Sequence, residues 1–180
     1  KGMYLYRKSK KRVKKHIQLL GSGTILREVI KAADLLEQDY AVACDIWSVT
    51  SFNELRRDIE QVSRQQRLSP ADHPSKNKSY VSQCFDGVSG PFIAATDYMK
   101  LYADQIRADV PGDYYVLGTD GFGRSDLRTA LRHFFEVDAN MIAYTGLKAL
   151  FNQGDIDAAT LSKAQKALDI DLNKADPVTQ

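Results

Sequence analysis

The most informative stretch of the chain reads Tyr114-Tyr115-Val116-Leu117-Gly118-Thr119-Asp120-Gly121-Phe122-Gly123-Arg124-Ser125-Asp126. It opens as a short apolar strand and then passes three glycines in six residues, which can take positive φ without a Cβ penalty. Ser125 or Asp126 is expected to cap a following helix, because either side chain can accept a hydrogen bond from its free N–H groups. The stretch therefore predicts a strand, a tight turn and a helix.

A turn of this kind at the carboxyl end of a parallel sheet is where α/β proteins place ligand sites. It matches neither the dinucleotide fingerprint nor the phosphate-binding loop, since no Gly-Lys-Ser/Thr follows. Because turn glycines are common in loops, a structural or interface role is favoured over ligand binding. The candidate interface or ligand loop comprises Gly118, Asp120, Gly121, Phe122, Gly123, Arg124, Ser125 and Asp126.

Strands and helices alternate along the rest of the chain. Strands are expected at 3–6, 16–20, 41–49, 80–85, 92–95 and 114–117, with helical periods between most of them and after the last. The first two strands are expected to form a hairpin. This alternation predicts a three-layer α/β/α domain with a mainly parallel sheet, in which the first strand can run against the others.

Several helix starts carry capping signals. Ser51 and Glu54 have the spacing of a capping box. Asp138 is placed to cap the helix from Ala139 to about Phe151, and the last helix is expected at 157–168. Thr96 or Asp97 is expected to cap a helix whose apolar positions are Tyr98, Leu101, Tyr102 and Ile106. In the helix after the glycine turn, Leu127, Leu131 and Phe134 are expected to form a buried stripe.

The composition is that of one globular domain. The chain has 180 residues, of which 43% are hydrophobic and 27% charged. No apolar run approaches the roughly 20 residues needed to span a bilayer, so no membrane partner is expected. The two cysteines lack metal-ligand spacing, and free thiols favour a reducing, cytoplasmic location.

Seven of the positive charges lie between Arg7 and Lys15. Such a run can bind phosphates in a salt-dependent way. It lacks interleaved aromatic residues and any recognisable nucleic-acid-binding motif. A solvated hairpin tip is therefore the favoured interpretation, and a nucleic-acid partner is not expected.

No arrangement of residues predicts catalysis by this chain alone. There is no Gly-x-Ser-x-Gly elbow, and His133 shares its helix with Arg128 and Arg132, where exposure is expected. Asp97, Asp120 and Asp126 could gather at the strand ends, but capping and turn chemistry explains each of them. We expect no catalytic, cofactor-binding or metal-binding residue.

Four shorter runs join the glycine stretch in one family pattern: Gln18-Leu-Leu-Gly-Ser-Gly23, Trp47-Ser-Val-Thr-Ser-Phe52, Ala95-Thr-Asp-Tyr-Met-Lys100 and His133-Phe-Phe-Glu-Val-Asp-Ala139. Together they resemble the C-terminal domain of the bacterial homodimeric pyruvate dehydrogenase decarboxylating component, a thiamine-diphosphate-dependent family of the transketolase-like superfamily. The resemblance covers residues 1–176 and leaves 177–180 as a tail. It implies a mixed sheet of five core strands, one of them antiparallel.

The resemblance also implies a longer, three-domain polypeptide that decarboxylates pyruvate and acetylates the lipoyl group of the dihydrolipoyl acetyltransferase component. Thiamine diphosphate and magnesium would be held by its other domains, so this chain alone is expected to be inactive. The implied partners are those domains, a second copy in a homodimer, and the acetyltransferase. The alternative is a stand-alone interaction or regulatory module that binds a partner domain or an anionic metabolite.

Overall fold

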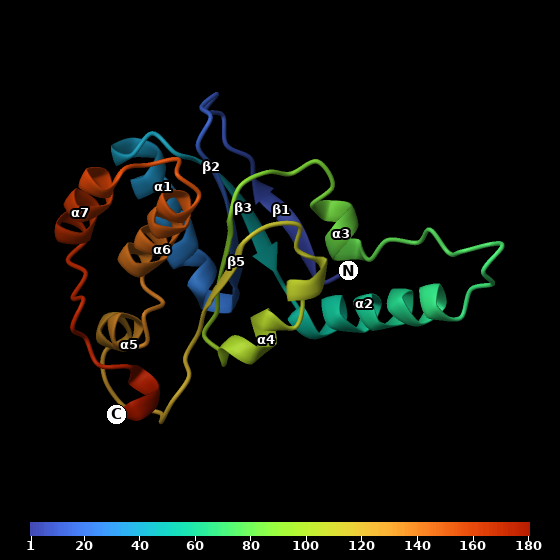
Figure 1. The fold of residues 1–180 in the computed structure, drawn as a ribbon. Helices are drawn as coiled ribbons and strands as arrows, with labels where there is room; N and C mark the ends of the chain where they lie inside the picture. The colour runs from blue at the N-terminus through green and yellow to red at the C-terminus, as the bar shows by residue number, and fades with distance from the viewer.

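The computed structural model describes residues 1–180, which build one five-stranded sheet in the order β1-β3-β2-β4-β5 (Figure 1). The strands are β1 (Met3–Arg7), β2 (His16–Ser22), β3 (Ala43–Val49), β4 (Phe92–Ala95) and β5 (Tyr114–Leu117). β1 runs antiparallel to β3, and every other pair is parallel. The predicted mixed, mainly parallel sheet with one antiparallel strand is confirmed.

Helices cover both faces of this sheet. One face packs against α1 (Leu26–Asp39), α6 (Ala139–Asn152) and α7 (Ala158–Ala167), with α5 (Arg128–Phe134) beside them (Figure 1). The other packs against α2 (Phe52–Arg67), α3 (Tyr80–Cys84) and α4 (Lys100–Asp104). Three 3₁₀ turns, η1 (Gly23–Ile25), η2 (Arg107–Asp109) and η3 (Pro177–Thr179), complete the chain. The three-layer α/β/α architecture is confirmed.

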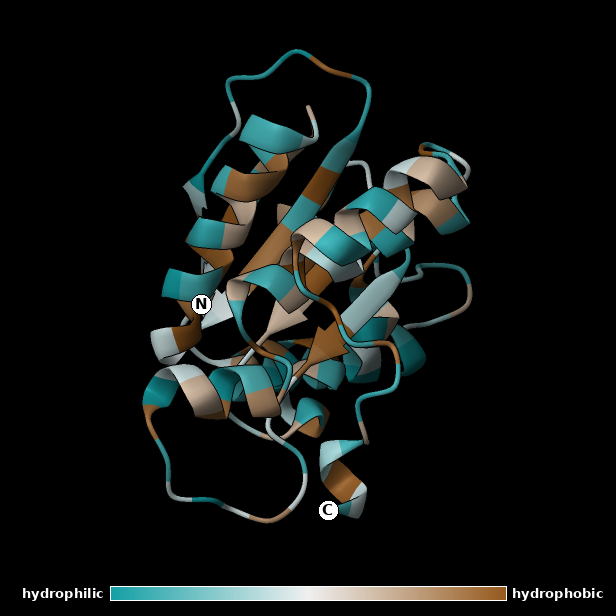
Figure 2. Cartoon of the chain, turned by 90° about the vertical axis from the view of Figure 1, so that its left-hand side faces the viewer, coloured by the Kyte–Doolittle hydropathy of each residue, from teal (hydrophilic) through white to brown (hydrophobic).

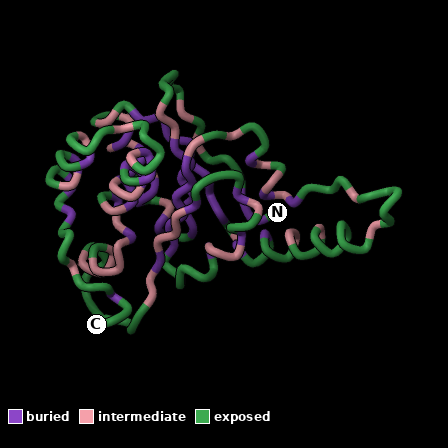
Figure 3. Tube along the Cα trace, viewed as in Figure 1, coloured by how far each residue is buried: buried purple, intermediate pink, exposed green.

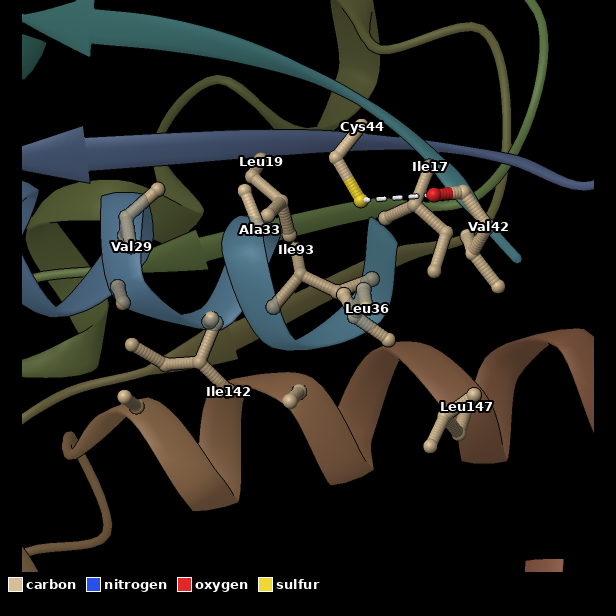
Figure 4. Packing of buried hydrophobic residues seen from close by; sticks show 14 of the residues in the cluster. Ile17, Leu19, Val29, Ala33, Leu36, Val42, Cys44, Ile93, Ile142 and Leu147 are labelled. Atoms are coloured by element: carbon tan, nitrogen blue, oxygen red, sulfur yellow. Dashed lines mark hydrogen bonds between the residues drawn. The ribbon is translucent and has the colours of Figure 1, made fainter. Parts of the chain in front are cut away.

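The two-residue period of the strands divides the core into two clusters. In β2, Ile17 and Leu19 point to a cluster of 23 buried residues under α1 and α6, whereas Leu20 points to a cluster of 14 under α2, α3 and α4. Figure 4 shows Leu36 of α1 and Ile142 and Leu147 of α6 among the side chains of the first cluster. In Figure 2 the strands carry brown, hydrophobic stretches interrupted by teal or pale residues, and the helices alternate between teal and brown.

Polar side chains buried within the sheet are paired at its amino end. Asp45 accepts a hydrogen bond from the Ser9 backbone N–H at 2.8 Å and lies 3.1 Å from His16 Nε2. Gln18 accepts from Trp47 Nε1 at 2.9 Å and donates to the Ser89 carbonyl at 3.1 Å. These contacts explain how a carboxylate is tolerated in an otherwise apolar strand.

The expected hairpin between the first two strands is wrong, because β3 lies between them. Strands two places apart are separated by about 10 Å, a distance that the loop at 8–15 crosses easily. β2 occupies the centre of the sheet, with parallel partners on both sides. β1 therefore pairs only with β3 and forms one edge of the sheet.

The strand expected at 80–85 is also wrong, because these residues form α3. Ser79 caps the helix by accepting a hydrogen bond from the Ser82 N–H at 3.1 Å. Val81 and Phe85 are buried four residues apart, the spacing of one helix face. Six alternating residues are too few to distinguish a strand from a short capped helix.

Two predicted caps are confirmed, because Ser51 and Asp138 accept hydrogen bonds from the N–H groups of Glu54 and Met141. The expected last helix is also present, and Asp157 caps it by accepting a hydrogen bond from the Thr160 N–H. Ser51 begins α2, whose buried residues are Phe52 and Leu55, both near its start. The rest of α2 and the loop up to residue 78 extend away from the body of the domain (Figure 3).

Candidate interface at the carboxyl end of the sheet

The base of the glycine loop is fixed by backbone contacts with the segment that precedes α4. A Cβ atom at Gly118 would lie 2.7 Å from the Tyr98 carbonyl oxygen and 2.8 Å from the Lys100 nitrogen. Thr119 donates its N–H to Tyr98 O at 2.9 Å, and Asp120 accepts the Lys100 N–H at 3.3 Å. Gly118 is required here because the two backbones approach too closely for a side chain.

Gly121 has a different role. Its φ is +107°, which side chains disfavour, and a Cβ atom there would lie 2.6 Å from the Pro177 carbonyl oxygen. The chain end returns past α5 to this point, and Pro177 is buried. Gly123 meets nothing within 4 Å. The turn therefore brings together two segments separated by more than fifty residues in sequence, β5 and the C-terminal 3₁₀ turn.

The tip of the loop exposes apolar side chains. Phe122 is 79% exposed and Leu127 is 74% exposed. The Arg124 guanidinium lies 4.2 Å from the centre of the Phe134 ring. Asp126 accepts the Leu127 N–H at 2.6 Å. Ser125 is exposed beside them.

The predicted entry into the following helix is wrong. α5 begins at Arg128, its N-cap position is Leu127, and no side chain caps it. The expected buried stripe is also wrong: Leu127 is exposed, and Leu131 and Phe134 are half-buried. Residues 118–127 form no regular structure, so the helix starts later than expected and its apolar side is only partly covered.

The neighbouring α4 departs from its prediction in the same direction. It begins at Lys100 without a side-chain cap, and Asp97 instead lies 3.2 Å from Thr24 Oγ1. Ala103 and Ile106 are buried, whereas Tyr98, Leu101 and Tyr102 are exposed. Three of the four apolar positions expected for this helix therefore lie on the surface.

Exposed apolar side chains thus come from three segments that contact one another. We call them the carboxyl-end surface: Tyr98, Met99, Leu101, Tyr102, Phe122, Leu127 and Val178. The segments are joined by the Thr119–Tyr98 hydrogen bond and by the packing of Gly121 on Pro177. Large exposed apolar patches of this kind mark protein interfaces.

A cleft of about 270 Å³ lies beside this surface, lined by Ser22, Thr50, Ser51, Phe52, Asn53, Tyr98 and Tyr102. The direction of the strand order reverses between β2 and β4, and ligands of open α/β sheets bind at such a reversal. The predicted loop instead follows the edge strand β5. Sequence reasoning missed this cleft, although Gly21-Ser22-Gly23-Thr24 after a buried strand was its signal.

The acidic residues at this end are used separately. Asp97 approaches Thr24, Asp120 accepts the Lys100 N–H, and Asp126 accepts the Leu127 N–H. No group of three or more His, Cys, Asp or Glu residues could hold a metal ion. His133 Nδ1 lies 3.1 Å from Asp138, the cap of α6, near the surface. Each of the three carboxylates is thus engaged in a local contact.

Burial governs the cysteine in β3. It raises the pKa of the Cys44 thiol, and the nearby Glu37 carboxylate adds to the effect. The thiol donates to the Val42 carbonyl (Figure 4). Cys44 is therefore an inert core residue at neutral pH.

None of the helices has the length and apolar character needed to cross a membrane.

Comparison with known proteins extends the sequence evidence. Over 179 residues the chain is 54% identical to the pyruvate dehydrogenase E1 component of Pseudomonas aeruginosa, covering 99% of this chain and 20% of that protein. The protein of the same name from Cupriavidus necator is 47% identical over 180 residues, again 99% of this chain and 20% of that protein. The chain thus spans about a fifth of the length of these relatives.

Solved transketolases share the fold at low identity. The enzyme of Campylobacter jejuni superposes with a TM-score of 0.52 at 18% identity, covering 82% of this chain and 18% of that one. The enzyme of Leishmania mexicana gives 0.53 at 16% identity, covering 84% and 18%. The model of the transketolase-like TK C-terminal domain matches residues 2–138. The chain therefore belongs to the transketolase-like C-terminal domain family.

Proposed function

We propose that this chain serves as the C-terminal domain of a pyruvate-decarboxylating subunit of a pyruvate dehydrogenase complex. The observation that carries the proposal is 54% identity across 99% of the chain to a protein named for that component. The subunit would convert pyruvate to CO₂ and acetylate the lipoyl group of the dihydrolipoyl acetyltransferase in the cytoplasm. Thiamine diphosphate and magnesium would be bound by the part of the subunit outside this chain.

Within that subunit, the chain has a structural and assembly role. The carboxyl-end surface exposes Phe122 and Leu127 in a loop whose base is held by backbone contacts. Fully burying one such side chain is worth about 1.5–3 kcal/mol. We assign this surface to contact with the remaining domains of the same subunit, either directly or across a homodimer.

Activity measurements test the catalytic part of the proposal. The purified 180-residue chain, supplied with pyruvate, thiamine diphosphate and magnesium, is expected to release no CO₂ above the protein-free background. A polypeptide that carries this chain behind the missing domains is expected to turn over pyruvate. Turnover by the chain alone, or none by the longer polypeptide in its folded state, would contradict the proposal.

Substitution at the surface tests the assembly part. The double variant Phe122→Ser/Leu127→Ser is expected to lower the thermal midpoint of the longer polypeptide by several degrees. It should change the unfolding free energy of the chain alone by about 0.5 kcal/mol or less, as for other exposed sites. Val13→Ser at the opposite end of the sheet is the control. Equal effects of the two changes on the longer polypeptide would place the contact elsewhere.

A further inference from the structure

The positive run has a defined place in the fold that the role above does not use. Residues 8–15 form an arch that leads from the edge strand β1 across β3 to the central strand β2. The arch projects from the amino end of the parallel strands, opposite the glycine loop (Figure 1). We call residues 8–15 the basic arch.

Alternate residues of the arch attach it to the domain. Ser9 donates its N–H to Asp45 at 2.8 Å and its hydroxyl to Glu37 at 2.6 Å. Lys11 donates to the Glu37 carbonyl, and Lys15 donates to the Tyr40 carbonyl at 3.1 Å. Both lysines thus satisfy carbonyls at the end of α1, where positive charge is favoured.

The residues between these anchors point a second set of cations outward. Lys8, Lys10, Arg12 and Lys14 are all exposed, and none of them forms an ion pair or a side-chain hydrogen bond within the chain. They occupy every second position, so even a fully extended chain would keep the outer two within roughly 20 Å. The arch therefore presents four unpaired cations in a compact group, and the anchoring residues attach this group to the domain.

The charge balance sets the size of a partner. The segment from Arg7 to Lys15 carries seven positive charges, and the carboxylates that contact it are Asp34, Glu37 and Asp45. Four positive charges remain uncompensated. A partner segment with at least four carboxylates can neutralise the group.

We propose that the basic arch is a docking site for a short acidic segment of another polypeptide. The anchors hold the arch before the partner arrives, which lowers the entropy lost on binding. The arch contains no aromatic side chain, so it lacks the stacking platform that single-stranded nucleic acid requires. Lysine ammonium groups on flexible stems suit individual carboxylates. These features favour an acidic protein segment over a nucleic acid.

The experiment uses the whole 180-residue chain and a fluorescein-labelled hexaglutamate peptide, followed by fluorescence anisotropy at low salt. The test variant is Lys8→Gln/Lys10→Gln/Arg12→Gln/Lys14→Gln. The matched control is Arg64→Gln/Arg67→Gln/Lys76→Gln/Lys166→Gln, which removes the same charge from exposed sites outside the arch. Both variants should keep the parental thermal midpoint, because none of the eight side chains forms a hydrogen bond or ion pair with the domain.

We expect the arch variant to weaken peptide binding by about tenfold or more and the control variant by less than threefold, since each exposed ion pair contributes modestly. Binding of the parent should also weaken as salt rises. Undetectable binding by the parent, or equal losses in the two variants, overturns the proposal. Tighter binding of a thymidine hexanucleotide than of the peptide also overturns it and assigns the arch to nucleic acid.

Discussion

The exposed loops at the two ends of the sheet differ in the contacts that hold them and in the side chains that they expose. At the carboxyl end, backbone contacts at Gly118 and Gly121 fix the loop, and apolar side chains such as Phe122 face outward. At the amino end, side chains such as Ser9 and Lys11 fix the arch, and charged side chains face outward. The loop at the carboxyl end is thus held by its backbone and exposes apolar side chains. The arch is held by polar side chains and exposes cations.

This difference predicts two kinds of contact. Apolar surface left in water costs about 25 cal/mol per Å², so the carboxyl-end surface suits a permanent interface within a larger protein. Exposed cations stay hydrated, and their attraction to a partner is screened over about 10 Å at 0.1 M salt. The arch suits a reversible, salt-sensitive contact.

The largest effect is expected at the amino end, for Gly90→Ala. Gly90 has φ +100°, and a Cβ atom there would overlap the backbone oxygen of His16, the first residue of β2. Strain and overpacking together should lower the unfolding free energy by about 4 kcal/mol in urea denaturation. β2 is central to the sheet and cannot move aside.

Gly87→Ala is the control for this change. Gly87 has φ +70° and nothing within 4 Å, so alanine there should cost only about 1–2 kcal/mol of left-handed strain. If the two alanine variants proved equally stable, close packing at the start of β2 would not be what holds the amino end.

A smaller effect is expected at the carboxyl end, for Gly121→Ala. Backbone strain and overpacking both act here too, because φ is +107° and the Pro177 oxygen is close. The neighbour here is the short 3₁₀ turn η3 rather than a central strand, so the loss should be about 2 kcal/mol. Release of the C-terminal turn should also speed amide hydrogen exchange at Val178, whose N–H is bonded to Asp176 in the folded state.

Gly123→Ala tests the same loop without the close contact, since nothing lies within 4 Å of that position and its φ is not positive. It should change the unfolding free energy by about 0.5 kcal/mol or less. A loss at residue 123 that equals the loss at residue 121 would show that the whole loop, rather than its contact with Pro177, sets the stability.

The fold was predictable from the sequence because burial imposes a clear pattern. β3 is buried along its whole length and reads as an interior strand, and the capping residues Ser51 and Asp138 mark their helices correctly. Strand order was not predictable. The loop between β1 and β2 is compatible with a hairpin or with a crossing, and only the pairing with β3 decides between them.

The glycine turn was predicted from the sequence, but its contacts were not. Three glycines in six residues correctly indicated a turn after β5, yet they could not reveal that Gly118 contacts the α4 segment and Gly121 contacts Pro177. Apolar spacing predicts a buried stripe that includes Leu127, although this residue is exposed. Periodicity shows which residues share a face, but it cannot show whether that face is covered within this chain.

The next prediction concerns alkaline pH and the core next to the basic arch. Burial raises the pKa of the Cys44 thiol above its ordinary value of 9.0. Above that pH, the unfolded chain loses the proton that the folded chain keeps, so the unfolded state binds fewer protons and stability falls. The stability advantage of the parent over Cys44→Ala should therefore shrink by about 1 kcal/mol between pH 8 and pH 10.

Accessibility provides an independent measurement at the same residue. Iodoacetamide should alkylate the half-buried Cys84 in the folded chain, whereas Cys44 should react only on unfolding. Mass spectrometry of the digested protein distinguishes the two sites. Rapid modification of Cys44 under native conditions would show that the start of β3 opens, and the amino end would then be less rigid than its buried hydrogen bonds indicate.

The smallest effect is expected for the ion pair at the foot of the arch. Arg7 Nη1 lies 2.8 Å from Asp34, and both side chains are partly exposed, at 32% and 45%. Screening limits such a pair to about 0.5 kcal/mol, so Arg7→Gln should lower the unfolding free energy by that amount at low salt and by less in 0.5 M NaCl. A double-mutant cycle with Asp34→Asn isolates the coupling. A coupling free energy that persists in high salt would mean that the arch is held as rigidly as the glycine loop. The contrast between a permanent contact at one end and a reversible contact at the other would then depend only on which side chains are exposed.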